Sequence, residues 1–248
     1  IDLGTTFSAI ASLDDLGNPE VLASIEDNRK ITASAVYLKD NEVIVGDKAL
    51  TYLKDQSNNV ILQTKREMEN DVVYSTDQGK WVSDTELVDA YTPAQVSALI
   101  LKKLKEYTSD VKKVVITVPA MFAEKARQAT LDAAKIADLE VIELINEPTA
   151  AVLHYASLPG VEVGGRVMIF DLGGGTFDVT FAEVKNKKVD VMTSRGDKYL
   201  GGRDFDREIT KLMKTGEDLT KDSRISISTI HGVKGNEREN VVVTTDLS

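Results

Sequence analysis

The sequence predicts an α/β fold made of two related lobes. Strand-like and helix-like segments alternate along most of the 248 residues, which favours sheets flanked by helices. The segment Ile1–Ile10 recurs, with one added glycine, as Phe170–Thr180, and an internal repeat of this kind indicates two copies of one structural unit. Hydrophobic residues make up 42% of the chain, which is enough to bury a core.

The predicted strands are short apolar runs that are rich in β-branched residues. They cover Val114–Val118, Leu139–Ile145 and Arg166–Phe170. The repeated segment predicts two hairpins in addition. Each copy is an apolar strand that ends in Asp, followed by a tight turn of Gly and Thr and by a second, alternating strand.

Four helices are predicted between and after these strands. The first follows Thr92, which is the N-cap, with Pro93 in the first turn and Gln95 as the capping-box partner. The third helix begins at Pro148 and the fourth covers about Asp204–Met213. The apolar stripes of the first and second helices recur at helical spacing: Val96, Leu99, Ile100, Leu104 and Tyr107, then Ala126, Ala129, Ala133 and Ala137.

Three regions follow from this pattern. Residues 1–165 form the first lobe and residues 166–214 begin the second. After about Thr215 the helical pattern stops, so residues 215–248 are expected to be an unrelated tail with strands at Ile225–Ile230 and Val241–Val243. The chain begins at Ile1, inside an apolar run and without a methionine, which suggests a truncated start.

Charge and composition exclude several classes of protein. The formal net charge of −10 disfavours nucleic acid as a partner, because phosphate binding needs clustered Lys and Arg. No cysteine is present, which excludes disulfides and thiolate metal sites, and two histidines are too few for a multi-histidine centre. No apolar run has membrane-spanning length and no signal peptide precedes Ile1, so a cytoplasmic protein with no membrane partner is expected.

The turns of the two predicted hairpins are suited to phosphate. Glycine allows a phosphate to approach the backbone closely, and Gly173-Gly174-Gly175-Thr176 can present successive amides and a hydroxyl. Gly4-Thr5-Thr6 can do the same from the other lobe. One such hairpin would more simply be an ordinary turn, but a matched pair favours phosphate. The loop is not a Walker A motif, because no G-x-x-x-x-G-K-[ST] occurs.

Carboxylates beside these turns point to a hard cation. Asp2 and Asp171 stand directly before the two turns, where they would repel a phosphate unless Mg²⁺ lay between them, held through water. Glu147 could act near the cation, or could simply stabilise a helix N-terminus. Lys65 could reach a phosphate or orient water, or could be a solvated lysine. Asp178 could support the site or merely face outwards.

Five further segments are informative as text: Ile1–Ser8, Val115–Ala120 with Arg127–Thr130, Ile145–Ala151, Phe170–Val179 and Leu200–Asp206. They resemble the signature segments of the 70-kDa heat-shock chaperones, in the same order and at similar spacing over about residues 1–212. Actin and the sugar kinases share the two-hairpin plan but not the I-N-E-P-T-A-A or V-P-A-x-F text.

The resemblance implies an actin-like ATPase (ribonuclease-H-like) fold, with lobe I and the beginning of lobe II, that binds ATP or ADP with Mg²⁺. Asp2 and Asp171 would hold Mg²⁺ through water, and Pro119 and Arg127 would relay the nucleotide state. The residues implied in catalysis are Lys65, Glu147, Asp171 and Thr176. Those implied in nucleotide binding are Gly4, Thr5, Thr6, Phe7, Gly173, Gly174, Gly175, Thr176, Gly201 and Gly202.

The resemblance also implies partners and missing parts. Co-chaperones are expected partners, whereas unfolded clients require a substrate domain supplied elsewhere. The rest of lobe II, with its adenosine-binding elements, is not in the chain, so hydrolysis depends on whether this part is competent. An inactive or regulatory binding module is therefore a second hypothesis.

The tail has a resemblance of its own. Ile225–Glu237 is similar to the T-x-H-x-x-K-G-x-E motif of superfamily-1 helicases, with His231 and Lys234 at the motif positions. An ordinary polar turn between two strands would explain the same residues. A fusion fragment that carries a helicase-derived tail is a third hypothesis, whereas a working helicase is not expected because no Walker A motif accompanies the tail.

Overall fold

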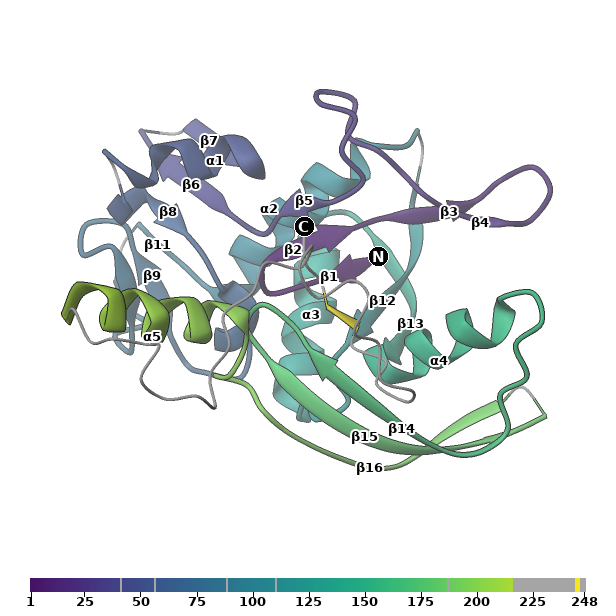
Figure 1. Cartoon of the computed structure of the whole chain (residues 1–248). Coiled ribbons are helices and arrows are strands. Elements are labelled where there is room, and N and C mark those ends of the chain that lie inside the picture. Colours follow the sequence, from purple (N-terminus) through teal and green to yellow (C-terminus); the bar gives the residue numbers. More distant parts are fainter. Residues whose placement is uncertain are drawn as a thin grey trace.

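The chain forms a mixed α/β structure in which two larger sheets lie side by side (Figure 1). One sheet has five strands and the other has four, and three smaller sheets surround the first. The computed structural model describes residues 1–40, 42–55, 57–87, 89–109, 111–186, 188–215 and 244–245.

The five-stranded sheet is the centre of the first lobe. β1 runs parallel to β12 and antiparallel to β2, and β12 runs parallel to β13. The strand order is β13 (Glu140–Asn146), β12 (Lys113–Val118), β1 (Asp2–Leu3), β2 (Phe7–Ala9) and β5 (Thr32–Ala33).

Smaller elements flank this sheet. The hairpin of β3 (Ala11–Leu13) and β4 (Pro19–Val21) projects from the body of the molecule (Figure 1). Two three-stranded sheets consist of β6 (Val36–Lys39), β7 (Glu42–Val45) and β8 (Val60–Ile61), and of β9 (Val73–Ser75), β10 (Lys80–Val82) and β11 (Ala90–Tyr91). The short helices here are α1 (Asp47–Leu50), η1 (Thr51–Leu53), η2 (Ser57–Asn59) and η3 (Thr64–Glu67).

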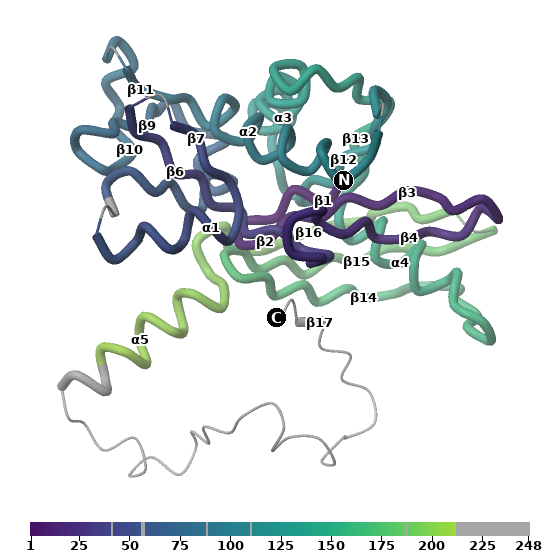
Figure 2. The backbone as a smooth tube through the Cα atoms, turned by 90° about the horizontal axis from the view of Figure 1, so that it is seen from above, coloured from purple at the N-terminus to yellow at the C-terminus, as the bar shows by residue number. Residues whose placement is uncertain are grey.

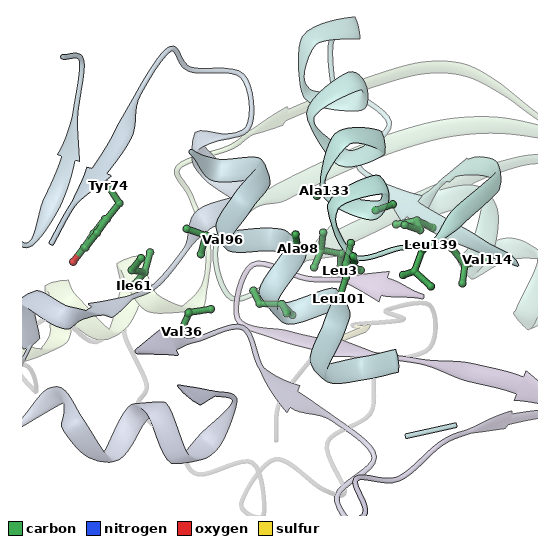
Figure 3. Packing of buried hydrophobic residues seen from close by; sticks show 14 of the residues in the cluster. Leu3, Val36, Ile61, Tyr74, Val96, Ala98, Leu101, Val114, Ala133 and Leu139 are labelled. Carbon is green, nitrogen blue, oxygen red and sulfur yellow. The ribbon is translucent and has the colours of Figure 1, made fainter. Parts of the chain in front are cut away.

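Helices α2 (Pro93–Lys105) and α3 (Glu124–Ile136) pack against each other and close the core. α2 begins with the predicted capping box, in which the Thr92 hydroxyl accepts the Gln95 N–H and the Gln95 side chain accepts the Thr92 N–H. Figure 3 shows Leu101 of α2 beside Leu3 of β1, within one continuous buried cluster. The buried alanines of α3 let this helix lie close to its neighbours.

The second lobe is built on three antiparallel strands and one helix. Its strands are β14 (Gly165–Leu172), β15 (Phe177–Lys185) and β16 (Lys188–Asp197), and its helix is α5 (Gly202–Thr215). Helix α4 (Glu147–Ser157) follows β13 of the first lobe and packs against both larger sheets. β17 (Thr244–Thr245) pairs parallel with the last two residues of β14. α5 extends away from the sheet, as Figure 2 shows. Strand alternation leaves Met168, Phe170 and Phe181 exposed and buries Asp178 and Thr180.

The predicted elements can now be compared with the structure. Each of the three predicted strands lies within an observed strand or overlaps it to within a residue, and both hairpins of the repeat are present. The third helix begins at Glu147, one residue before the predicted Pro148. The predicted tail strands and the helicase-like segment lie outside the described residues. In the described part, no helix is both long enough and apolar enough to cross a membrane.

Candidate functional site

A cleft of about 810 Å³ opens between the two hairpins of the repeat. Residues of both lobes border it, from the turns of the hairpins, from η3 and from the start of α4. The predicted site residues that line it are Asp2, Gly4, Thr5, Thr6, Phe7, Lys65, Glu147, Asp171, Gly173, Gly174 and Thr176. The fold therefore brings together residues that are up to 174 positions apart in the sequence.

Two serines of the first lobe hold the first hairpin turn in place. The Gly4 N–H donates to Ser8 Oγ (3.2 Å), and Ser34 Oγ donates to the Gly4 carbonyl (2.8 Å). The Ser34 N–H donates to the Thr6 carbonyl (2.8 Å). Glycine is required at position 4, because a Cβ there would lie 2.0 Å from the Phe7 carbonyl oxygen.

The second hairpin turn is fixed through three successive carbonyls. Gly173 accepts the Gly202 N–H (3.0 Å) and Gly174 accepts the Arg203 N–H (3.1 Å), both from the start of α5. The Gly175 carbonyl accepts Arg66 Nε (2.7 Å). A trans peptide holds its C=O and N–H in opposite directions, so the N–H groups of Gly174, Gly175 and Thr176 point away from these donors. Successive N–H groups aimed to one side form an anion-binding concavity.

The two turns are in direct contact. A Cβ on Gly174 would lie 2.2 Å from Thr6 Oγ1, and a Cβ on Gly175 would lie 2.3 Å from Thr5 Cγ2. The hydroxyl oxygens of Thr5 and Thr6 are buried and have no hydrogen-bond partner in the described part. A buried hydroxyl without a partner carries a desolvation cost. Both threonines border the cleft, so a ligand there could supply the missing partners.

Lys65 and Glu147 form a buried ion pair at the side of the cleft, with 2.5 Å between Nζ and Oε1. Burial acts to lower the pKa of Lys65, but the carboxylates of Glu147, Asp2 and Asp171 outweigh it and raise that pKa. Burial raises the pKa of Glu147 to about 7, against the lowering effect of Lys65. The structure thus places Lys65 in the site and not on the solvated surface.

Negative charge accumulates in the same place. Asp2 accepts a hydrogen bond from the Thr117 hydroxyl (3.0 Å), and Asp171 lies directly before the second turn. Asp178 pairs with Asp171 across β14 and β15, and burial together with the charge of Asp171 raises the pKa of Asp178 to about 6. Four carboxylates, including Glu147, therefore act on the single ammonium of Lys65. Such an excess of negative charge is suited to a cation.

Gly201 and Gly202 are placed differently from the other predicted site residues. They lie behind the second turn, where a Cβ on Gly201 would be 2.4 Å from the Gly175 nitrogen. They are not among the residues that border the cleft, and neither is Gly175. At Gly201 only glycine allows the two backbones to approach so closely, whereas a Cβ on Gly202 would make an ordinary contact with Gly174 Cα at 3.8 Å. Both glycines therefore lie against the back of the turn.

Sequence reasoning missed Ser34, Arg66 and the role of Asp204. Ser34 belongs to no motif, and its contact with the first turn depends on the pairing of β5 with β2. Arg66 follows Lys65 directly, but a neighbouring basic residue alone gives no sign of where its side chain goes. Asp204 lies in the Leu200–Asp206 segment that was singled out, without a role of its own.

Comparison with known proteins supports the same interpretation. The family model described as Hsp70 protein matches residues 1–231. The chain belongs to the Hsp70 family.

Named relatives agree with this assignment. The chaperone protein DnaK of Thermotoga neapolitana is 38% identical over 235 residues, covering 92% of this chain. DnaK of Mycoplasmopsis agalactiae is 41% identical over 218 residues, covering 86% of the chain. The chain spans about a third of the length of these curated relatives, with 37% and 34% of them covered.

Membership of the Hsp70 family identifies the fold. The mixed α/β structure is the actin-like ATPase fold of Hsp70 nucleotide-binding domains, and Hsp70 proteins bind ATP or ADP with Mg²⁺. The donor chemistry of the cleft fits such a ligand, because it combines carboxylates, hydroxyls without partners and aligned backbone N–H groups. In the described part, no group of three or more His, Cys, Asp or Glu is arranged to hold a metal ion directly.

Proposed function

We propose that this chain binds Mg²⁺ with ATP or ADP between its two hairpins and hydrolyses ATP slowly, as part of an Hsp70-type chaperone. The observation that carries the proposal is that Thr5 and Thr6 contact Gly174 and Gly175, so that the two hairpin turns meet at one cleft. Because both turns border one space, one polyphosphate can be bound from both lobes.

The phosphates would be bound by backbone and hydroxyl groups. Thr5 and Thr6 would use their buried hydroxyls, and Gly174, Gly175 and Thr176 would use successive N–H groups. Asp2 and Asp171 would hold the cation through water from the two sides. When bound, Mg²⁺ would neutralise part of the phosphate charge.

Hydrolysis would be an in-line transfer of the terminal phosphoryl group to water. A bond forms between phosphorus and the water oxygen, the bond to the bridging oxygen breaks, and one water proton is released. Lys65 would orient the attacking water, and its ion pair with Glu147 fixes the direction of the ammonium group. Such catalysis depends on positioning and electrostatics and needs no covalent intermediate.

The activity of a whole chaperone is a further part of the proposal. Arg127 donates to the Asn146 side chain (2.6 Å), so α3 is linked to the residue that precedes Glu147. This link supports a relay through Arg127 and the buried Pro119. We expect co-chaperones as partners, clients only through a substrate domain, and a cytoplasmic location.

Calorimetric titration of the purified chain with ATP tests this function. Saturable binding in Mg²⁺ that weakens at least tenfold in EDTA is expected, with the same loss in Asp171→Asn because a carboxylate facing the cation is removed. Asp190→Asn is the matched control, since Asp190 is an exposed aspartate of β16, and it should bind as the wild type does. Absence of binding by the folded chain, or equal binding with and without Mg²⁺, would contradict the proposal.

A further inference from the structure

One buried side chain crosses between the lobes and contacts the second hairpin turn from behind. Arg66 lies in η3 of the first lobe and is 9% exposed. Its Nε donates to the Gly175 carbonyl (2.7 Å), its Nη2 donates to Asp204 of α5 (2.6 Å), and its Nη1 donates to Gln63 (3.2 Å). All three nitrogens are used, two of them by the second lobe.

With the contact to Gly175, three successive carbonyls of the second hairpin turn each accept a hydrogen bond. The first two carbonyls of the turn are held by N–H groups of α5, within the second lobe, whereas the third is held by Arg66 from the first lobe. The peptide that carries this third carbonyl also carries the Thr176 N–H, and the two groups point in opposite directions. The direction of the Thr176 N–H therefore depends on a side chain from the opposite lobe.

Asp204, which binds the guanidinium of Arg66, is itself stabilised as a carboxylate. Asp204 lies in the first turn of α5, where a carboxylate is stabilised by the helix dipole. Burial acts to raise the pKa of Asp204, but the hydrogen bond and charge of Arg66 outweigh it and hold that pKa below its ordinary value. Arg66 is thus charge-paired, and its planar guanidinium is held so that Nε faces Gly175.

The same short helix carries the catalytic lysine. Gln63 adopts a left-handed conformation (φ 58°) just before η3, and the two following cations diverge from this turn. Lys65 reaches Glu147 in the first lobe, and Arg66 reaches Asp204 and Gly175 in the second. One turn of helix therefore connects the lysine to the glycine turn.

We propose that Arg66 is a positioning residue that orients the Gly175–Thr176 peptide for phosphate binding and couples the placement of Lys65 to the position of the second lobe. The consequence for nucleotide affinity rests on the proposed function, but the orientation of the peptide does not. If Arg66 acted only as an ion pair between the lobes, a substitution that keeps its charge would preserve its function.

Arg66→Lys distinguishes a role in positioning the peptide from a role as a simple ion pair. Lysine keeps the charge and can pair with Asp204, but its single nitrogen lacks the fixed geometry that serves Asp204 and Gly175 together. Lys198→Ala is the matched control, because Lys198 also forms an ion pair across the lobes, with Glu69 (3.1 Å), without contacting the turn. Arg66→Ala removes both contacts.

The first measurement is the backbone amide signal of Thr176 in the nucleotide-free, ¹⁵N-labelled chain. A carbonyl hydrogen bond alters the shift of the following amide, so Arg66→Ala and Arg66→Lys should both move this signal while Lys198→Ala leaves it in place. An unmoved signal in Arg66→Lys would overturn the proposal, whether or not the chain binds nucleotide. If Arg66→Ala does not fold, Arg66→Lys carries the test.

The second measurement is the affinity for Mg-ATP. Both Arg66 variants should bind about tenfold more weakly, the effect of losing one charge-assisted hydrogen bond, and Lys198→Ala should stay within twofold. Full rescue by Arg66→Lys, or an equal loss in Lys198→Ala, would show a general inter-lobe contact and overturn the positioning role. Failure of the wild type to bind would contradict the proposed function and leave the amide measurement to decide on Arg66.

Discussion

The two glycine-containing hairpins come from one repeated design, but the structure supports them differently. The first turn is held by Ser8 and Ser34, both from its own lobe. The second turn is held by α5 and, across the lobes, by Arg66. The comparison teaches that the first turn is held entirely within its own lobe, whereas the second turn is also held by a side chain of the other lobe.

Gly175→Ala should have the largest effect on Mg-ATP affinity, because the added methyl group would push the two hairpin turns apart. The added Cβ would lie 2.3 Å from Thr5 Cγ2, a distance that no van der Waals contact allows. We expect Mg-ATP binding to weaken roughly 100-fold or more, since a small misplacement of binding groups has such a cost. Calorimetry measures this change.

Gly164→Ala is the matched control for that substitution. A Cβ on Gly164 meets nothing within 4 Å, so this variant should bind Mg-ATP as the wild type does. If Gly175→Ala also binds normally, the contact between the hairpins is not needed for the site.

The next effect is a dependence of stability on pH, which arises from the carboxyls of Glu147 and Asp178. In metal-free buffer the folded chain holds the Glu147 proton up to a pKa of about 7, against 4.5 ordinarily, and the Asp178 proton up to about 6. The folded state thus binds more protons, so the free energy of unfolding falls as pH rises from about 4.5 to 7. A fall of roughly 1–3 kcal/mol is expected from Glu147.

Urea unfolding at several pH values measures this change. Glu147→Gln and Asp178→Asn should each flatten the profile, because each removes a carboxyl whose pKa is raised in the folded chain. A wild-type stability that rises over this range would show that the two carboxyls are ionised in the folded chain.

Ser34→Ala should have the smallest effect of the three. It removes the hydroxyl that holds the Gly4 carbonyl, but the Ser34 N–H still holds the Thr6 carbonyl. The hydroxyl also bonds to Ser8 Oγ (2.8 Å), but only its bond to Gly4 holds the turn directly. We expect Mg-ATP affinity to fall about three- to tenfold, the cost of losing that bond to the turn. Combining Ser34→Ala with Arg66→Ala should give additive losses in free energy, because the two side chains support separate turns. Strong non-additivity would mean that the hairpins are not supported independently.

The sequence predicted most of what is local. The capping box at Thr92 and the repeated hairpins follow from short-range patterns, and both are present. Lys65, which lines the cleft, was assigned to the site only through the family resemblance, because a lysine in a polar segment gives no sign of burial by itself.

Short-range sequence patterns could not predict contacts between distant segments. Arg66 and Asp204 are 138 residues apart, and no periodicity connects them. Gly201 was predicted as a nucleotide contact from a motif, but its packing against the backbone of Gly174 and Gly175 could not be predicted in the same way. The second hairpin thus depends on tertiary structure more than its repeat suggests.

The most direct test of a single site shared by both hairpins uses Mn²⁺ in place of Mg²⁺, with ATP, on the ¹⁵N-labelled chain. Paramagnetic broadening should reach the amide signals of both Gly4–Thr6 and Gly173–Thr176 at the same nucleotide concentration. The signals of Gly160 and Gly164 should remain sharp. Broadening of only one hairpin at saturating Mn-ATP would contradict a site formed by the two lobes together.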